Sequence, residues 1–286
     1  AKALQCISLM IPLQQQTAEL SRVIDVQRPG KIYHPCYFGI VQLNDRYIVL
    51  ADFTNKACCL YDSSYNFITS HELSGTPDSM CQTEDNEFAV TMPDTKSVKF
   101  LSIWDRSIRD SGTITVKYKC IGLDAVNREE IVVSGPCSDT QSNNKCYWSL
   151  VTRNGNVKLH HELDCRATSY AFAALDMSKS RVYISVGDAN AVYCFGLTDG
   201  KQYFVYSSND LKSPRGVAVD REDNVYVVGN ESNNIHKLSP DGVTLQIIAS
   251  GVPHYPRGIS FSHSREHFVI TNIGEMDRKL HYFVHK

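Results

Sequence analysis

"SPRGVAVDREDNVYVVGNESNNIHKLSPDG" (residues 213–242) carries three short apolar runs separated by turn residues. The first run follows a Pro-Arg-Gly start, an acidic turn with an Asn precedes the second, and an Asn-rich turn precedes the third. Runs of β-branched and aromatic residues bounded by Gly, Asn and Asp are typical of short strands joined by turns. The stretch therefore predicts three strands in succession, followed by an Asp-Gly turn.

The same order of strands and turns recurs along the chain. "PRGI" at residues 256–259 repeats the "PRGV" start at 214–217, and "PCYFGIVQL" at 35–43 is a weaker copy. Between residues 76 and 211 the copies are less regular but keep their turns and a spacing of roughly 40–46 residues. Each complete unit ends in a fourth alternating run. The predicted units are 34–75, 76–120, 121–165, 166–211, 212–251 and 252–286.

Four short antiparallel strands per unit predict the blade of a β-propeller, because one such sheet cannot bury both faces until it stacks on its neighbours. The unit from 252 reaches three strands before the chain ends, and an open ring would leave a sheet edge unpaired. Residues 19–27, "ELSRVIDVQ", alternate like a strand and precede the first unit. We therefore predict an all-β, six-bladed propeller, a single domain over 1–286, in which this N-terminal strand completes the last blade.

Two other repeat architectures fit less well. The runs are too short for helices and alternate with a period of two residues, which argues against a helical repeat. A seven-bladed propeller of the WD type is favoured only by Trp104-Asp105, which occurs once, and the chain has no Gly-His dipeptide. We therefore expect Trp104 to pack inside a blade.

The residues 212–251, with their P-R-G-V-A-V-D start and N-x-x-N-x-I-x-K-L third run, resemble the NHL repeat. The resemblance is weaker at 34–75 and 252–286. The turn before the third strand departs from the family's Asp-x-x-Asn in most units, since only Asp52 and Asn55 match it well. The family consists of six-bladed propellers, often the substrate-recognition end of tripartite-motif ubiquitin ligases.

This resemblance implies a non-catalytic recognition module in a cytoplasmic tripartite-motif-like protein. The chain starts with Ala-Lys and without Met, and it shows no RING-type spacing of Cys and His. We therefore expect a fragment of a longer protein, with any ligase activity and any oligomerisation in domains outside it. A protein or peptide is the expected partner, and RNA binding stays open as the alternative.

The starts of the inner strands are the predicted binding site, because they meet around one mouth of the central channel. Guanidinium groups there would pair with phosphate or carboxylate, and aromatic side chains would stack on the ligand. Three cations among six starts and a net charge of −2 favour a protein or peptide over RNA. The candidate ligand-binding residues are Arg215, Arg257, Lys119, Tyr37, Phe38, Met80, Tyr170, His254 and Tyr255.

A metal-dependent hydrolase or lyase is the third and least favoured hypothesis. The inner strands begin with apolar or small residues, and acidic residues stand only at their far ends. Asp124, Asp176 and Asp220 recur there, where a turn Asp is expected to bind its own backbone. The sequence thus predicts no catalytic residue, no metal ligand and no cofactor.

Composition bears on the compartment of the protein. The hydrophobic content is 42% and the charged content 21%, as in ordinary globular proteins, and the apolar stretch 4–13 is too short to span a membrane. No membrane association is expected. The ten Cys residues form no C-x-x-C motif. Free thiols in a reducing, cytoplasmic environment are expected, and a bond between Cys137 and Cys146 stays open.

Overall fold

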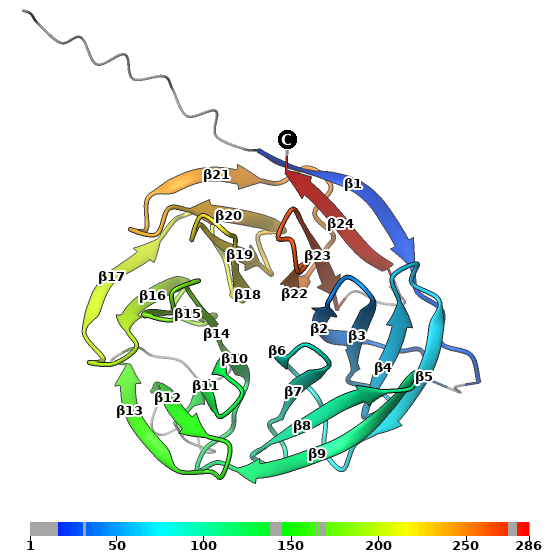
Figure 1. Ribbon diagram of the computed structural model, residues 1–286. Coiled ribbons are helices and arrows are strands. Elements are labelled where there is room, and N and C mark those ends of the chain that lie inside the picture. Colours follow the sequence, from blue (N-terminus) through cyan, green and yellow to red (C-terminus); the bar gives the residue numbers. More distant parts are fainter. Residues whose placement is uncertain are drawn as a thin grey trace, which may run out of the picture.

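A computed structural model of the chain describes residues 17–30, 33–137, 145–163, 165, 170–273 and 279–285. In this part of the chain all regular structure is β, and six four-stranded antiparallel sheets are arranged as blades around a central axis (Figure 1). The predicted all-β, six-bladed propeller is confirmed. Within the described ranges no helix is long and apolar enough to cross a membrane, and the apolar stretch 4–13 lies outside them.

Five blades run from the inner to the outer strand in chain order. The strands of the first three are β2 (Tyr37–Leu43), β3 (Tyr47–Asp52), β4 (Ala57–Asp62) and β5 (Phe67–Glu72); β6 (Met80–Glu84), β7 (Glu87–Met92), β8 (Ser97–Trp104) and β9 (Ser107–Thr115); and β10 (Gly122–Asn127), β11 (Glu130–Pro136), β12 (Cys146–Thr152) and β13 (Val157–Leu163). The next two consist of β14 (Ala171–Leu175), β15 (Arg181–Val186), β16 (Ala191–Gly196) and β17 (Gln202–Ser207); and β18 (Pro214–Val219), β19 (Val225–Gly229), β20 (Asn234–Leu238) and β21 (Thr244–Ile248).

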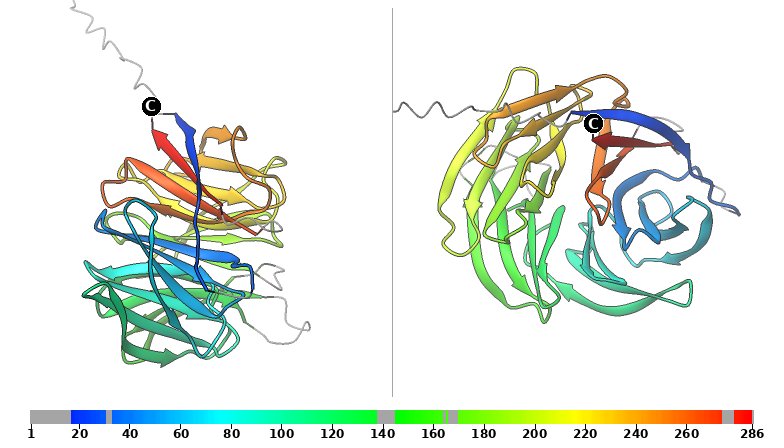
Figure 2. Two further views of the ribbon diagram at one scale, coloured as in Figure 1. Left: turned by 90° about the vertical axis from the view of Figure 1, so that its right-hand side faces the viewer. Right: turned by 45° about the horizontal axis from the view of Figure 1, so that its top comes forward.

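The sixth blade joins the two ends of the chain. Its inner strands are β22 (Pro256–Phe261), β23 (His267–Asn272) and β24 (Lys279–His285), and its outer strand is β1 (Ala18–Asp25). β1 runs antiparallel to β24, with Ala18 opposite His285 and Asp25 opposite Lys279, and lies along it at the rim of the ring (Figures 1 and 2). The prediction that an N-terminal strand closes the propeller is confirmed.

The hydrophobic core is divided among the interfaces between neighbouring blades. Each of six buried apolar clusters joins residues of two adjacent blades, as where Leu60 of β4 and Phe88 of β7 share a cluster. The inner strands also contact their neighbours around the whole ring. A single blade buries its second face only against the next blade, which explains why the sequence repeats its strands as a set.

The Gly of the repeated Pro-x-Gly start is required by close approach between inner strands. A Cβ on Gly216 would lie 2.4 Å from the carbonyl oxygen of Arg257, and one on Gly258 would lie 2.6 Å from that of Phe38. A side chain at either position would push the neighbouring inner strand outward. The start that recurs in the sequence therefore sets the narrow spacing of the blades at this end of the channel.

Trp104 does not pack inside a blade as expected. It stands at the end of β8 with 65% of its surface exposed, and the Arg109 guanidinium lies 5.9 Å from its ring centroid. The expectation was wrong because the strand ends at this residue, so the ring points beyond the inter-blade contact. Trp148 of β12 is the fully buried Trp, in the interface between the third and fourth blades.

Candidate functional site

One end of the central channel is filled by side chains from the starts of the inner strands. Nη2 of Arg257 donates to both carboxylate oxygens of Asp78 at 2.7 Å, and its guanidinium stacks 3.7 Å over the Phe38 ring. The guanidinium of Arg215 lies 3.4 Å over the Tyr170 ring. Arg257 is 1% exposed and Arg215 is 9% exposed. Four predicted ligand-binding residues thus come together, and Asp78 joins them through its ion pair with Arg257.

The other five predicted site residues do not join this group. Tyr37 is buried between the last and first blades, where its hydroxyl hydrogen-bonds that of Tyr61 at 2.7 Å. Met80 is buried and faces the channel, Lys119 is half-buried, and both His254 and Tyr255 are exposed. A binding role for all nine residues stays a prediction.

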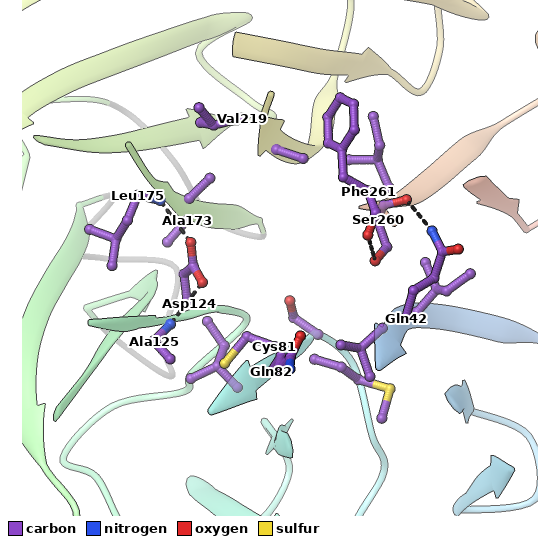
Figure 3. A pocket seen from close by; sticks show the side chains of 18 of the residues that line it. Gln42, Cys81, Gln82, Asp124, Ala125, Ala173, Leu175, Val219, Ser260 and Phe261 are labelled. Carbon is purple, nitrogen blue, oxygen red and sulfur yellow. Dashed lines mark hydrogen bonds between the residues drawn. The ribbon is translucent and has the colours of Figure 1, made fainter. Parts of the chain in front are cut away.

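A cavity of about 530 Å³ occupies the rest of the channel and is lined by the inner strands of all six blades (Figure 3). It reaches the turns that join the first and second strands of several blades, where exposed residues such as Glu84 and Arg128 line it. Neither Arg215 nor Arg257 lines it. This volume lies within the range of sites for small organic ligands.

Asp124 places a carboxylate in the wall of this cavity. Its Oδ1 accepts the backbone N–H of Ala125 and its Oδ2 that of Leu175 on the next blade, each at 2.8 Å (Figure 3). Each carboxylate oxygen keeps a second lone pair for a ligand or a proton. The two bonds fix the carboxylate between two blades, in a position where it can act on a bound molecule.

The three recurring Asp residues therefore differ from one another. Asp176 and Asp220 accept backbone N–H groups of their own turns, from Ser180 at 2.7 Å and from Asn224 at 2.8 Å, as predicted. Asp124 follows the prediction only in part, because one of its oxygens bridges to the neighbouring blade. The sequence shows the same strand-end Asp in all three units and gives no sign of which one faces the cavity.

Other polar groups of the wall are held by the backbone. Gln42 donates from Nε2 to the Ser260 carbonyl at 2.8 Å, and Gln82 donates to the Glu84 carbonyl at 3.1 Å. Burial raises the pKa of the Cys81 thiol well above its ordinary value, and the charge of Asp124 raises it further. Cys81 is therefore protonated at neutral pH and is a poor nucleophile.

The open end of the channel is lined by charges of both signs. They are Glu84, Asp85, Arg128, Lys179 and Arg265. Neighbouring turns are tied to one another across the blades, since Asp223 accepts the N–H of Met177 at 2.7 Å and Arg265 donates to the Val219 carbonyl. The mouth is therefore a fixed rim, with opposite charges available to a polar ligand.

The donor set of the described residues does not fit the metal site that the third hypothesis required. Among these residues no group of three or more His, Cys, Asp and Glu side chains gathers around a common point. We derive no step through a metal ion.

Comparison with known proteins agrees with the architecture. Residues 199–234 match the model of a family described as "Beta-propeller repeat" (SBBP). The chain is a β-propeller. No curated protein matches the sequence.

Two solved structures share the fold over nearly their whole length. The virginiamycin B lyase from Staphylococcus aureus has a TM-score of 0.65 and 11% identity, with 94% of this chain and 99% of that chain covered. A streptogramin B lyase has a TM-score of 0.67 and 12% identity, with 93% and 98% covered. At sequence identities this low, the structural match shows a shared fold and nothing more.

These comparisons correct two predictions made from the sequence. Both structures are lyases and neither is a ubiquitin-ligase recognition domain, so the assignment as a non-catalytic substrate-recruiting module is overturned. The prediction that the chain is not an enzyme is overturned by the same finding. Both predictions depended on the NHL-like units and on the dismissal of Asp124 as a turn residue.

Proposed function

We propose that this propeller is an enzyme of the lyase kind that acts on a small organic molecule held in the channel. The observation that carries the proposal is the Asp124 carboxylate, fixed in the wall of a cavity of about 530 Å³. The fold shared with two lyases supports the choice of reaction class. The resemblance of the repeat units to NHL repeats stays a proposal, and we infer no function from it.

Asp124 is the proposed general base. In an elimination it takes a proton from a carbon beside an electron-withdrawing group, the C–H electron pair becomes a new C=C bond, and the leaving group departs with its own bonding pair. Lys179, which also lines the cavity, can protonate the departing group. Asp124 gains one proton and Lys179 loses one, so a transfer through solvent restores both. Positioned acid–base groups typically contribute about 10²–10⁴-fold to a rate.

The remaining wall binds and orients the substrate. Leu123, Leu175 and Phe261 provide apolar surface, and the fixed carboxamides of Gln42 and Gln82 interrupt it. The exposed lining of the cavity is slightly more polar than apolar, which favours a substrate that has polar groups of its own. The buried Arg257–Asp78 pair occupies the far end of the channel, so the substrate is proposed to enter past Lys179 and Arg128.

Turnover of virginiamycin B, the compound in the name of one structural neighbour, is the first test. Mass spectrometry separates the two reaction classes, because elimination products sum to the mass of the substrate and hydrolysis products sum to that mass plus one water. Asp124→Asn is expected to lower kcat by about 10²–10⁴-fold. Asp199→Asn, in an exposed turn that does not line the cavity, is the matched control and is expected to keep the parent rate.

The outcomes have different meanings. Failure to convert virginiamycin B excludes that compound, and a panel of small molecules with an acidic C–H bond then continues the search. An Asp124→Asn variant that converts any substrate at the parent rate contradicts the assignment of the base. Products that contain an added water replace the lyase by a hydrolase.

A further inference from the structure

The closed end of the channel contains one more buried positive charge than negative charge. Arg257 is ion-paired with Asp78, whereas the described residues offer Arg215 no carboxylate of its own. Nε and Nη1 of Arg215 and Nε of Arg257 are buried, and within the described ranges none has a hydrogen-bond partner. Three N–H donors and a net charge of +1 are therefore enclosed without compensation.

Such an arrangement is unfavourable unless something completes it. Buried donors in folded proteins are nearly always paired, and a buried charge needs a counter-charge or strong hydrogen bonds. Burial lowers the pKa of Arg215, and the neighbouring charge of Arg257 lowers it further, as expected of two cations held together. The Tyr170 ring, which Arg215 faces at 3.4 Å, accepts charge only weakly and cannot accept all of these N–H bonds.

We propose that this end of the propeller binds one small oxyanion, the carboxylate or phosphate group of a ligand, between Arg215 and Arg257. The anion supplies the missing negative charge and accepts the unpaired N–H groups. Guanidinium groups form charge-assisted hydrogen bonds with both kinds of oxyanion. Tyr170 forms one wall, because both guanidinium groups lie over its ring, at 3.4 and 5.2 Å from the centroid.

Asp78 limits the site to a single anion. Its carboxylate already neutralises Arg257, so a second anion would place two negative charges against one remaining positive charge. The site lies next to the proposed substrate cavity, because Phe38, over which Arg257 stacks, also lines that cavity; the cavity lining contains neither Arg215 nor Arg257. Oxyanion binding therefore does not depend on the proposed lyase activity, and each can fail without the other.

Thermal unfolding in sodium phosphate and in sodium acetate tests the proposal, with sodium chloride at equal ionic strength as the reference. A ligand that binds only the folded state raises Tm with a saturable concentration dependence. We expect such a rise for wild type with at least one of the two oxyanions, and a 1:1 stoichiometry by calorimetric titration. A rise with phosphate alone identifies the ligand group as a phosphate, and a rise with acetate alone identifies it as a carboxylate.

Arg215→Met removes the unpaired charge and keeps much of the side-chain length. It is expected to abolish the oxyanion response and to be at least as stable as wild type in chloride, because an uncompensated buried charge has been removed. Arg221→Met, which alters an exposed Arg paired with Glu222, is the matched control and keeps the response. Asp124→Asn also keeps it, which separates this site from the proposed active site.

If the Arg215→Met variant does not fold, Arg215→Lys tests whether Arg215 binds the oxyanion. It keeps the charge but loses the planar set of donors, so the saturable rise in Tm is expected to shift to higher oxyanion concentration. The proposal is overturned if wild type shows no saturable response to either oxyanion. It is equally overturned if Arg215→Met or Arg215→Lys responds exactly as wild type does.

Discussion

Asp78 and Arg257 face each other across the channel, 179 positions apart in the chain. The sequence suggested Arg257 as a ligand-binding residue and gave no reason to single out Asp78. A pair at this separation leaves no local pattern, since each residue belongs to the start of a different inner strand. The second bond of Asp124 was missed for a related reason, because its bond to Leu175 crosses into the next blade and is invisible within one unit.

Asp78→Asn is expected to destabilise the protein by about 3–5 kcal/mol, as breaking a buried ion pair by removing one partner does. Two buried guanidinium groups would then face each other without a counter-charge. Urea unfolding measures the loss. Asp110→Asn is the control, since Asp110 is exposed and its pairs with Lys99 and His71 are worth under about 1 kcal/mol. If both variants lost the same free energy of unfolding, the buried pair would contribute no more to stability than an exposed one.

The inner strand is the element that the sequence describes best. Its Pro-x-Gly start, its short apolar run and its turn recur in order, which made the strands, the blade and the closing role of β1 predictable. The same repetition hid the site, because six similar strands give no sign of which side chains meet in the channel. The cavity exists only when all six inner strands are assembled around it.

Gly216→Ala tests whether the spacing of inner strands depends on this start. The new Cβ would lie 2.4 Å from the Arg257 carbonyl oxygen and 3.1 Å from the Ile259 nitrogen, so the neighbouring backbone must move. Overpacking of this kind costs about 1–3 kcal/mol, to be measured by chemical unfolding. Gly187→Ala is the control, because its Cβ would meet nothing closer than 3.5 Å. That variant is expected to be unchanged or slightly more stable, and an equal loss in both would contradict the spacing argument.

The whole ring is stabilised by interfaces between blades, and several of these contain histidines that are held neutral. Burial lowers the pKa of His161, His236, His267 and His285 from its ordinary value. His267 and His285 belong to β23 and β24 of the blade that closes the ring. The histidines are thus distributed over three of the blades, and protonation acts on the assembled propeller more than on one site.

Acidification is therefore expected to loosen the propeller. Each of these histidines has a lower pKa folded than unfolded, so the unfolded chain binds more protons as pH falls below the unfolded value of about 6.5. Stability is full above that pH and decreases toward the lower folded pKa. We expect Tm to be nearly constant above about pH 7 and to fall between about pH 6.5 and about pH 5.5, as measured by circular dichroism, before carboxylates begin to titrate.

The contribution of one buried histidine to this pH dependence of Tm can be measured separately. His236 is fully buried, with Nδ1 2.7 Å from the Tyr206 hydroxyl and Nε2 3.2 Å from Nδ2 of Asn234, so a proton there breaks an enclosed network. His236→Gln is expected to flatten the decline of Tm with acid, because Gln does not titrate, even if it lowers Tm at neutral pH. His254→Gln at an exposed position is expected to leave the slope unchanged. A wild-type Tm that stays constant over this range would show that protonation of the inter-blade histidines does not control the stability of the ring.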